Sequence, residues 1–195
     1  THCISSAASD VYKRQVLSRL EATNNYNGLI EFKPLIFKCL EKKIYKIREM
    51  ASKSLPCIIT DDEILSTCSE LIEQAVSTND MNKCHGYIFA IKELILSSIS
   101  RKDEIDSTEN NLSCDLINKI YSYFGEFINN TNGISANYPI KLLYLQIVAI
   151  LNDYKQLDTK MIDQLGNWFI NENLTRFELN GAKQLSLSIS CDILL

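Results

Sequence analysis

Residues 45–76, YKIREMASKSLPCIITDDEILSTCSELIEQAV, decide the fold. Their apolar side chains recur every three or four residues, which is the spacing of one face of an α-helix. The second part of the stretch opens with Thr60-Asp61-Asp62-Glu63. In this capping box, a hydroxyl and a carboxylate satisfy backbone N–H groups at a helix start. The stretch therefore predicts two consecutive helices, the second beginning just after Thr60.

Similar apolar stripes cover most of the remaining chain, and residues 140–151 are apolar on nearly all sides, as in a central buried helix. Glycine (6) and proline (3) are scarce among the 195 residues, which favours helices over turn-rich sheets. Helix pairs are expected to start near residues 31, 61, 113 and 160, close to the period of about 40–47 residues in HEAT and armadillo repeats. We predict an all-α, HEAT/armadillo-like right-handed helical-repeat solenoid of about four antiparallel helix pairs. An ordinary helical bundle is the alternative.

Three segments define the expected organisation of the chain. Residues 1–15, THCISSAASDVYKRQ, resemble a translated sequencing adapter and are excluded from the fold. Residues 16–195 are expected to form a helical-repeat segment of a larger protein, because the chain begins with Thr and ends inside an apolar pattern. The polar residues at about 100–113 predict a flexible surface loop.

Charge and cysteine content limit the possible functions. The net charge is −4, so contact with a nucleic acid would have to come from a local basic patch. The spacings of the seven cysteines fit no zinc template, and their odd number indicates reduced thiols in a cytosolic or nuclear protein. We predict a cytoplasmic location. No apolar run approaches the roughly 20 residues that span a bilayer, so no membrane contact is expected.

The sequence offers little for catalysis. The six glycines are too far apart for G-x-G or a phosphate-binding loop, and neither G-x-S-x-G nor H-E-x-x-H occurs. Outside residues 1–15 the one histidine is His85, and neighbouring helix positions such as Cys84 and His85 point about 100° apart. We therefore predict a protein that is not an enzyme, with no cofactor, no metal and no small-molecule substrate.

A basic cluster is the first candidate binding site. Lys42, Lys43 and Lys46 fall at an expected helix–helix turn, where their side chains would project together. A cluster of this kind can bind the phosphates of a nucleic acid. The alternative is that the lysines complement the negative end of the preceding helix and keep the surface solvated.

Two motifs favour packing roles. In HEAT repeats the second helix often opens with an apolar residue and an arginine, followed three residues on by a small residue; Ile47, Arg48 and Ala51 fit this pattern. The second motif is Asn82-Lys83-Cys84-His85-Gly86. In it, Asn82 is expected to cap a helix and His85 to hydrogen-bond across a repeat interface. Glycine inside a helix costs about 1 kcal/mol relative to alanine, so Gly86 predicts the close approach of another backbone.

The run Tyr45-Lys-Ile-Arg-Glu-Met-Ala-Ser-Lys-Ser-Leu-Pro56, followed by Asn82-x-x-His85-Gly86, resembles the thyroid-adenoma-associated (THADA) family. Leu17-Ser-Arg-Leu20 fits the same register, and the resemblance covers about residues 16–99. It implies family-motif structural roles for the residues that match: Arg48, Glu49, Met50, Ala51, Asn82, His85 and Gly86.

The resemblance also implies a function. The chain would be a non-catalytic regulatory subunit that positions tRNA for ribose 2′-O-methylation at position 32 of the anticodon loop. Its partners would be tRNA and the catalytic subunit of a tRNA 2′-O-methyltransferase. The family's Arg-Arg-Ser-Ala-Gly-Leu-Pro stretch is absent from this chain. The alternative is a generic HEAT/armadillo protein-interaction scaffold, such as a transport or cytoskeletal factor.

Overall fold

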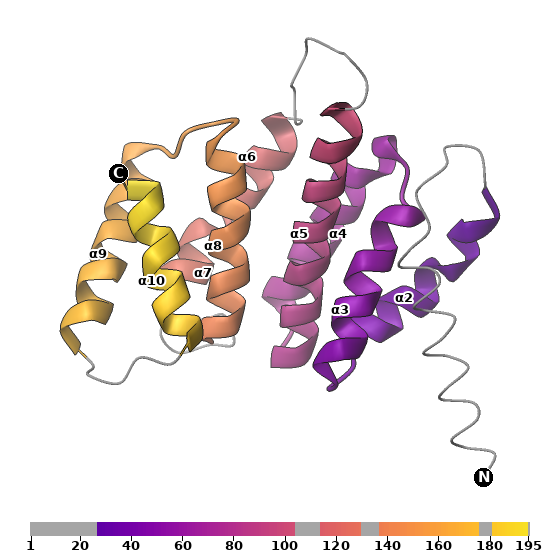
Figure 1. Ribbon diagram of the computed structural model, residues 1–195, viewed down its shortest axis with the longest axis horizontal. Coiled ribbons are helices and arrows are strands. Elements are labelled where there is room, and N and C mark those ends of the chain that lie inside the picture. The colour runs from indigo at the N-terminus through magenta and orange to yellow at the C-terminus, as the bar shows by residue number, and fades with distance from the viewer. Residues whose placement is uncertain (1–26, 104–113, 130–136, 176–180, 195) are drawn as a thin grey trace.

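The computed structural model describes residues 27–103, 114–129, 137–175 and 181–194 (Figure 1). Residues 1–15 and 104–113 lie outside the described residues, so the predicted adapter segment and most of the predicted polar loop stay predictions. All regular elements in the described ranges are helices. In chain order they are η1 (Asn27–Phe32), α2 (Lys33–Leu40), α3 (Tyr45–Ser54), η2 (Leu55–Cys57), η3 (Asp61–Glu63), α4 (Ile64–Ser77), α5 (Met81–Asp103), α6 (Cys114–Ser122), α7 (Phe124–Asn129), α8 (Tyr138–Asn152), α9 (Thr159–Thr175) and α10 (Gly181–Leu194).

The helices form successive antiparallel pairs stacked side by side. Helices α3, α5, α8 and α10 pack against one another in sequence and make one layer (Figure 1). Helices α2, α4, α6 with α7, and α9 are their pair partners and lie mainly on the other side. The pairs start close to the four predicted positions, and the prediction of an all-α helical-repeat fold is confirmed.

The predicted central helix is α8, which carries buried side chains on most of its circumference. Tyr144 is fully buried, and its ring stacks on that of Phe127 with centroids 4.5 Å apart. The centroid of the Phe124 ring lies 6.4 Å from the centroid of the Tyr144 ring. The Tyr144 hydroxyl donates a hydrogen bond to the carbonyl of Ile120 at 2.6 Å. This aromatic cluster ties α8 to α6 and α7.

Helix boundaries differ from the periodic pattern at three places. Helix α3 gives way to the 3-10 turn η2 because Pro56 has no N–H with which to continue the helix. One predicted stripe is divided into α6 and α7 at Tyr123, whose N–H bonds the Ile120 carbonyl in a tighter i−3 turn. Helix α5 extends to Asp103, so residues 100–103 are helical and not part of a loop.

Candidate functional site

The three lysines of the predicted basic cluster lie together at the turn between α2 and α3. Lys42 and Lys43 belong to the turn, Lys46 lies in the first turn of α3, and all three are exposed. The Lys46 ammonium pairs with Glu49 Oε2 at 2.8 Å. Among the described residues, no ion pair engages the ammonium groups of Lys42 or Lys43. The turn therefore presents two cations directly to solvent.

Arg48 anchors this turn from inside the protein. Its side chain is buried, and one guanidinium nitrogen, Nη1, donates to the carbonyls of Lys42 at 2.7 Å and Lys43 at 2.9 Å. The same nitrogen donates to Asn82 Oδ1 at 2.9 Å. Burial lowers the pKa of Arg48. The two family motifs thus meet in one hydrogen-bonded unit.

Asp80, and not Asn82, caps helix α5. The Asp80 carboxylate accepts a hydrogen bond from the N–H of Asn82 at 2.7 Å, and this bond lowers the pKa of Asp80. The side chain of Asn82 is thereby left to bind Arg48. The prediction that Asn82 caps the helix was wrong because a second cap-forming residue stands just before the helix begins.

Gly86 marks the point where α5 meets the end of α2. A Cβ added at Gly86 would lie 2.0 Å from the carbonyl oxygen of Leu40 and 2.8 Å from its carbonyl carbon. No side chain other than hydrogen fits this space, because backbone atoms cannot rotate away as a side chain can. Gly86 thereby lets the end of α2 lie directly against the backbone of α5.

Glu41 adds a polar contact beside this approach. Its carboxylate accepts a hydrogen bond from the Tyr87 hydroxyl at 2.8 Å and pairs with the Lys83 ammonium at 2.9 Å. The bond from Lys83 lowers the pKa of Glu41. The first two turns of α5 therefore hold both the end of α2 and the start of α3.

His85 belongs to a cluster of three rings between α3 and α5. Its ring meets Tyr45 and Phe89 edge-on, with centroids 5.7 and 5.9 Å away. Burial, with a smaller contribution from Arg48, lowers the pKa of His85 to about 4, so the ring is neutral at neutral pH. Its Nδ1 atom is buried without a hydrogen-bond partner among the described residues, so the predicted bond across the interface is not seen at this atom.

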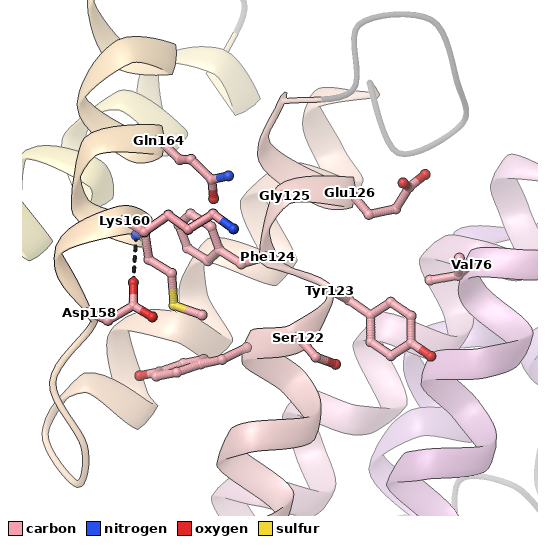
Figure 2. A pocket seen from close by; sticks show the side chains of 11 residues that line it. Val76, Ser122, Tyr123, Phe124, Gly125, Glu126, Asp158, Lys160 and Gln164 are labelled. Atoms are coloured by element: carbon pink, nitrogen blue, oxygen red, sulfur yellow. Dashed lines mark hydrogen bonds between the residues drawn. The ribbon is translucent and has the colours of Figure 1, made fainter.

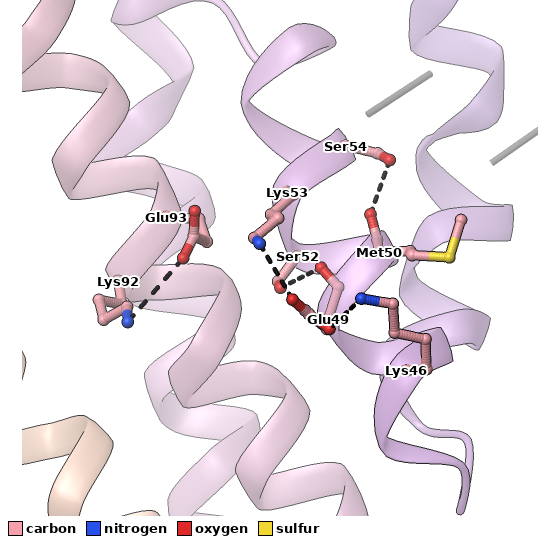
Figure 3. Close-up of polar contacts among 8 residues, drawn as sticks. All are labelled: Lys46, Glu49, Met50, Ser52, Lys53, Ser54, Lys92 and Glu93. Atoms are coloured by element: carbon pink, nitrogen blue, oxygen red, sulfur yellow. Dashed lines mark hydrogen bonds and ion pairs between the residues drawn. The ribbon is translucent and has the colours of Figure 1, made fainter. Parts of the chain in front are cut away.

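The remaining motif residues support α3. Glu49 binds Lys46 and Lys53 at 2.8 and 3.0 Å, and these bonds lower the pKa of Glu49 (Figure 3). Ala51 is buried, and the Met50 carbonyl accepts the Ser54 hydroxyl at 2.7 Å. Their positions fit the structural role that the family resemblance implies.

A separate cavity of about 460 Å³ lies where α4, the α6–α7 junction and the start of α9 meet (Figure 2). Polar and apolar side chains line it, and no residue of the predicted site does. The Asp158 carboxylate beside it accepts the Met161 N–H at 2.8 Å and so caps α9. Gly125 on the opposite wall faces the amide of Gln164, which an added Cβ would approach to 3.6 Å.

Metal-binding clusters and membrane-spanning helices are both absent from the described part of the chain. No three His, Cys, Asp or Glu side chains gather there in a way that could hold a metal ion. Of the helices described, none has both the length and the apolar character needed to cross a bilayer.

Sequence reasoning missed Glu41, Lys83, Tyr87 and the ring cluster. Lys83 and Tyr87 stand four residues apart, so they share a helix face. Nothing local in the sequence links that face to Glu41, which lies 46 residues before Tyr87. A contact at that separation can be recognised only when the helices are placed in space.

The fold and the buried arginine–asparagine unit define a class, the helical-repeat proteins whose helix pairs are joined by specific polar contacts. Residues 8–94 match the family described as Trm732, C-terminal TPR repeats. TPR, HEAT and armadillo proteins all stack helix pairs into solenoids. The match begins inside residues 1–15, whose adapter origin stays a prediction. Together with the relatives described next, this match agrees with the resemblance of the chain to the THADA family.

Two relatives carry related names. The chain is 27% identical over 141 residues to the tRNA (32-2′-O)-methyltransferase regulator trm732 of Schizosaccharomyces pombe. The aligned region covers 70% of this chain and 8% of that protein. The chain is also 30% identical over 94 residues to the tRNA (32-2′-O)-methyltransferase regulator THADA of Mus musculus. That aligned region covers 46% of this chain and 5% of that protein. The chain thus spans less than a tenth of either relative. No solved structure matches it significantly.

Proposed function

We propose that the chain is part of a non-catalytic regulatory subunit that positions tRNA for ribose 2′-O-methylation at position 32 of the anticodon loop. A partner methyltransferase would supply the catalytic site. The observation that carries the proposal is the joining of both family motifs at one turn, where Arg48 and Asn82 hold the backbone beneath Lys42 and Lys43. The two relatives are named as regulators of a methyltransferase, which supports a regulatory role.

The geometry supports a positioning mechanism. Phosphate contacts fix the register and orientation of a nucleic acid on a protein. Cations on a backbone held by a buried guanidinium keep a defined place relative to α5, whereas lysines on a loose loop would not. The turn could therefore hold an RNA strand in a fixed orientation toward a methyltransferase bound elsewhere on the repeat surface.

Disruption of the gene encoding this chain tests the proposed function. We expect ribose methylation at position 32 to be lost, as measured by mass spectrometry of purified tRNA fragments. Ribose methylation outside the anticodon loop of the same tRNA serves as the control and should persist. Unchanged methylation at position 32 would show that the proposed function is wrong.

Charge reversal tests the basic turn. The double variant Lys42→Glu/Lys43→Glu should weaken tRNA binding. It should also reduce the magnitude of the slope of log binding constant against log salt concentration by about 2, one unit for each lost phosphate contact. The matched control is Lys155→Glu/Lys160→Glu, which changes the net charge equally at exposed positions in the second half of the chain. Equal effects of the two double variants would contradict a specific role for the turn.

Capture of partners separates this proposal from the scaffold alternative. The full-length protein, purified from cells with nuclease and without, should retain a ribose methyltransferase. Recovery of transport or cytoskeletal proteins alone would favour the scaffold instead.

A further inference from the structure

The turn between α2 and α3 exposes apolar surface among its cations. Ile44 is 62% exposed and Tyr45 52% exposed, although both are large apolar side chains. They stand directly between the pair Lys42–Lys43 and Lys46 in the sequence. A turn that serves only to keep the surface solvated would gain nothing from an exposed aromatic ring at this position.

The inner side of the Tyr45 ring rests on other rings. It stacks near Phe89, with centroids 6.2 Å apart and planes inclined by 29°, and meets the edge of His85. Phe89 and His85 come from α5, where both are buried. The Arg48 guanidinium carbon lies 6.0 Å from the Tyr45 centroid. The ring is therefore supported from within, while about half of the residue's surface stays open to solvent.

This combination matches how proteins bind single-stranded nucleic acids. Such sites place aromatic rings, on which bases stack, beside cations that follow the phosphates. Stacking requires an unpaired base, because the bases of a duplex already cover one another. The cations of Lys42 and Lys43 have no carboxylate partner within 4 Å among the described residues, which favours an anionic ligand over a neutral protein surface.

We propose that the exposed face of Tyr45 stacks on an unpaired base of the bound RNA, while Lys42 and Lys43 pair with phosphates on either side of that base. The inference rests on the proposed function only in taking tRNA as the ligand. It adds that the turn reads a single-stranded loop and not the stem. Arg48 is a positioning residue in this arrangement, because it holds the backbone that carries the ring and both lysines.

Binding of an anticodon-arm hairpin RNA with 2-aminopurine in its loop tests the inference. Tyr45→Ala in the 195-residue chain should weaken binding about tenfold or more, as expected for the loss of one stacked base. Tyr45→Phe keeps the ring and should bind within about twofold of the unmodified chain. Quenching of the 2-aminopurine fluorescence should accompany binding to the unmodified chain and Tyr45→Phe, and disappear with Tyr45→Ala.

Two controls separate stacking from folding. Tyr45→Leu keeps apolar bulk against Phe89 but offers no ring, so it should bind as weakly as Tyr45→Ala while retaining the helical circular dichroism of the unmodified chain. Tyr154→Ala removes an exposed tyrosine after α8 and should leave binding unchanged. A blunt duplex with the sequence of the stem should bind Tyr45→Ala and the unmodified chain equally.

Failure of the inference is distinct from failure of the proposed function. If Tyr45→Leu binds the hairpin as tightly as the unmodified chain, or if the hairpin is not bound, stacking by Tyr45 is overturned even when methylation at position 32 depends on the gene. If Tyr45→Leu loses the methyltransferase but keeps the hairpin, Tyr45 faces a protein and the inference is likewise overturned.

Discussion

The helix pairs on the two sides of residue 104 are joined in different ways. In residues 33–103, here the N-terminal half, α2 and α3 meet α5 through a bare backbone contact at Gly86 and hydrogen bonds from Arg48 and Tyr87. In residues 114–194, the C-terminal half, α6 and α7 meet α8 mainly through the rings around Tyr144. The N-terminal half depends on particular atoms, whereas the C-terminal half depends more on filled volume.

This difference explains where family motifs are found. A contact between particular atoms admits few residue types, so it leaves a recognisable sequence such as Arg48 with Asn82 and Gly86. Volume can be filled by many combinations of apolar side chains, so it leaves only periodicity. The part of the family match that lies in the two compared halves, residues 33–94, falls entirely in the half with atom-specific contacts. The following variants test the comparison, from the largest expected effect to the smallest.

Gly86→Ala should have the largest effect. Its Cβ would overlap the Leu40 carbonyl, and separating α2 from α5 should lower the free energy of unfolding by about 3 kcal/mol. Gly166→Ala, in α9, is the matched control: nothing lies within 4 Å of its added Cβ, so it should raise stability by up to about 1 kcal/mol. Urea denaturation of the 195-residue chain measures both. A loss of stability in both variants would contradict the comparison.

Arg48→Met should follow, with a loss of about 2–3 kcal/mol. It keeps an apolar stem but leaves two carbonyls and the Asn82 amide oxygen without their donor. Lys141→Met removes a second buried cation among the described residues, whose ammonium donates to the Ile128 carbonyl at 2.7 Å and lies 5.5 Å from the centroid of the Trp168 ring. Its expected loss is smaller, about 1 kcal/mol, for the bond lost at the Ile128 carbonyl. The denaturation midpoints of the two variants measure these losses. A lower midpoint for Lys141→Met than for Arg48→Met would contradict the comparison, because the C-terminal half would then depend more on a single polar side chain.

Acidification should weaken the N-terminal half through His85. Its folded pKa, about 4, lies below its ordinary value of 6.5, so the unfolded chain binds more protons between these values. Stability is full above pH 6.5 and falls as the pH drops toward 4, by about 2 kcal/mol between pH 7.5 and 5. Thermal unfolding at these two pH values measures the loss.

Among the described residues, the other groups with a shifted pKa change this profile only outside that window or in the opposite direction. The pKa values of Glu41, Glu49 and Asp80 are lowered, so their stabilising bonds are lost only at more acidic pH. Burial raises the pKa of Glu93, which gives the opposite slope. The variant His85→Phe isolates the histidine and should flatten the profile; an equally steep profile in that variant would refute the role of His85.

Removal of a tyrosine hydroxyl should have the smallest effect. Tyr144→Phe loses a buried bond to Ile120 and should cost about 1 kcal/mol. Tyr87→Phe loses a bond to Glu41, which keeps its partner Lys83, so we expect less than about 1 kcal/mol. Chemical denaturation of both variants gives the comparison, and a larger loss for Tyr87→Phe would show that polar fastening of the N-terminal half is stronger than inferred.

Much of the fold could be predicted from the sequence because helical periodicity is a local signal. The pair starts near residues 31, 61, 113 and 160 came from apolar spacing alone, and the structure places helix pairs at these positions. The division between α6 and α7 could not be predicted, because the apolar stripe runs through it without a proline. The end of α5 was placed too early, because polar residues such as Arg101 read as a loop although Arg101 bonds Asp61 at 2.8 Å.

The candidate site was only partly accessible to the same reasoning. The cost of a helical glycine indicated a close backbone at Gly86, but nothing in the sequence named Leu40 as the partner. Asp80 and Asn82 are both good caps, and the choice between them depends on where α5 begins. The RNA-binding role of Lys42, Lys43 and Lys46 stays a prediction.

The contact at Gly86 has a mechanical consequence. Side chains between two helices can absorb a displacement, because they can change rotamer when the helices are pushed together. At Gly86 no side chain lies between the backbone of α5 and the carbonyl of Leu40, the last residue of α2. A displacement of α5 by the neighbouring α8 would therefore be passed to α2 almost undiminished, and the adjoining turn would move with it. Bending of the repeat stack would thus shift Lys42 and Lys43 as one rigid unit.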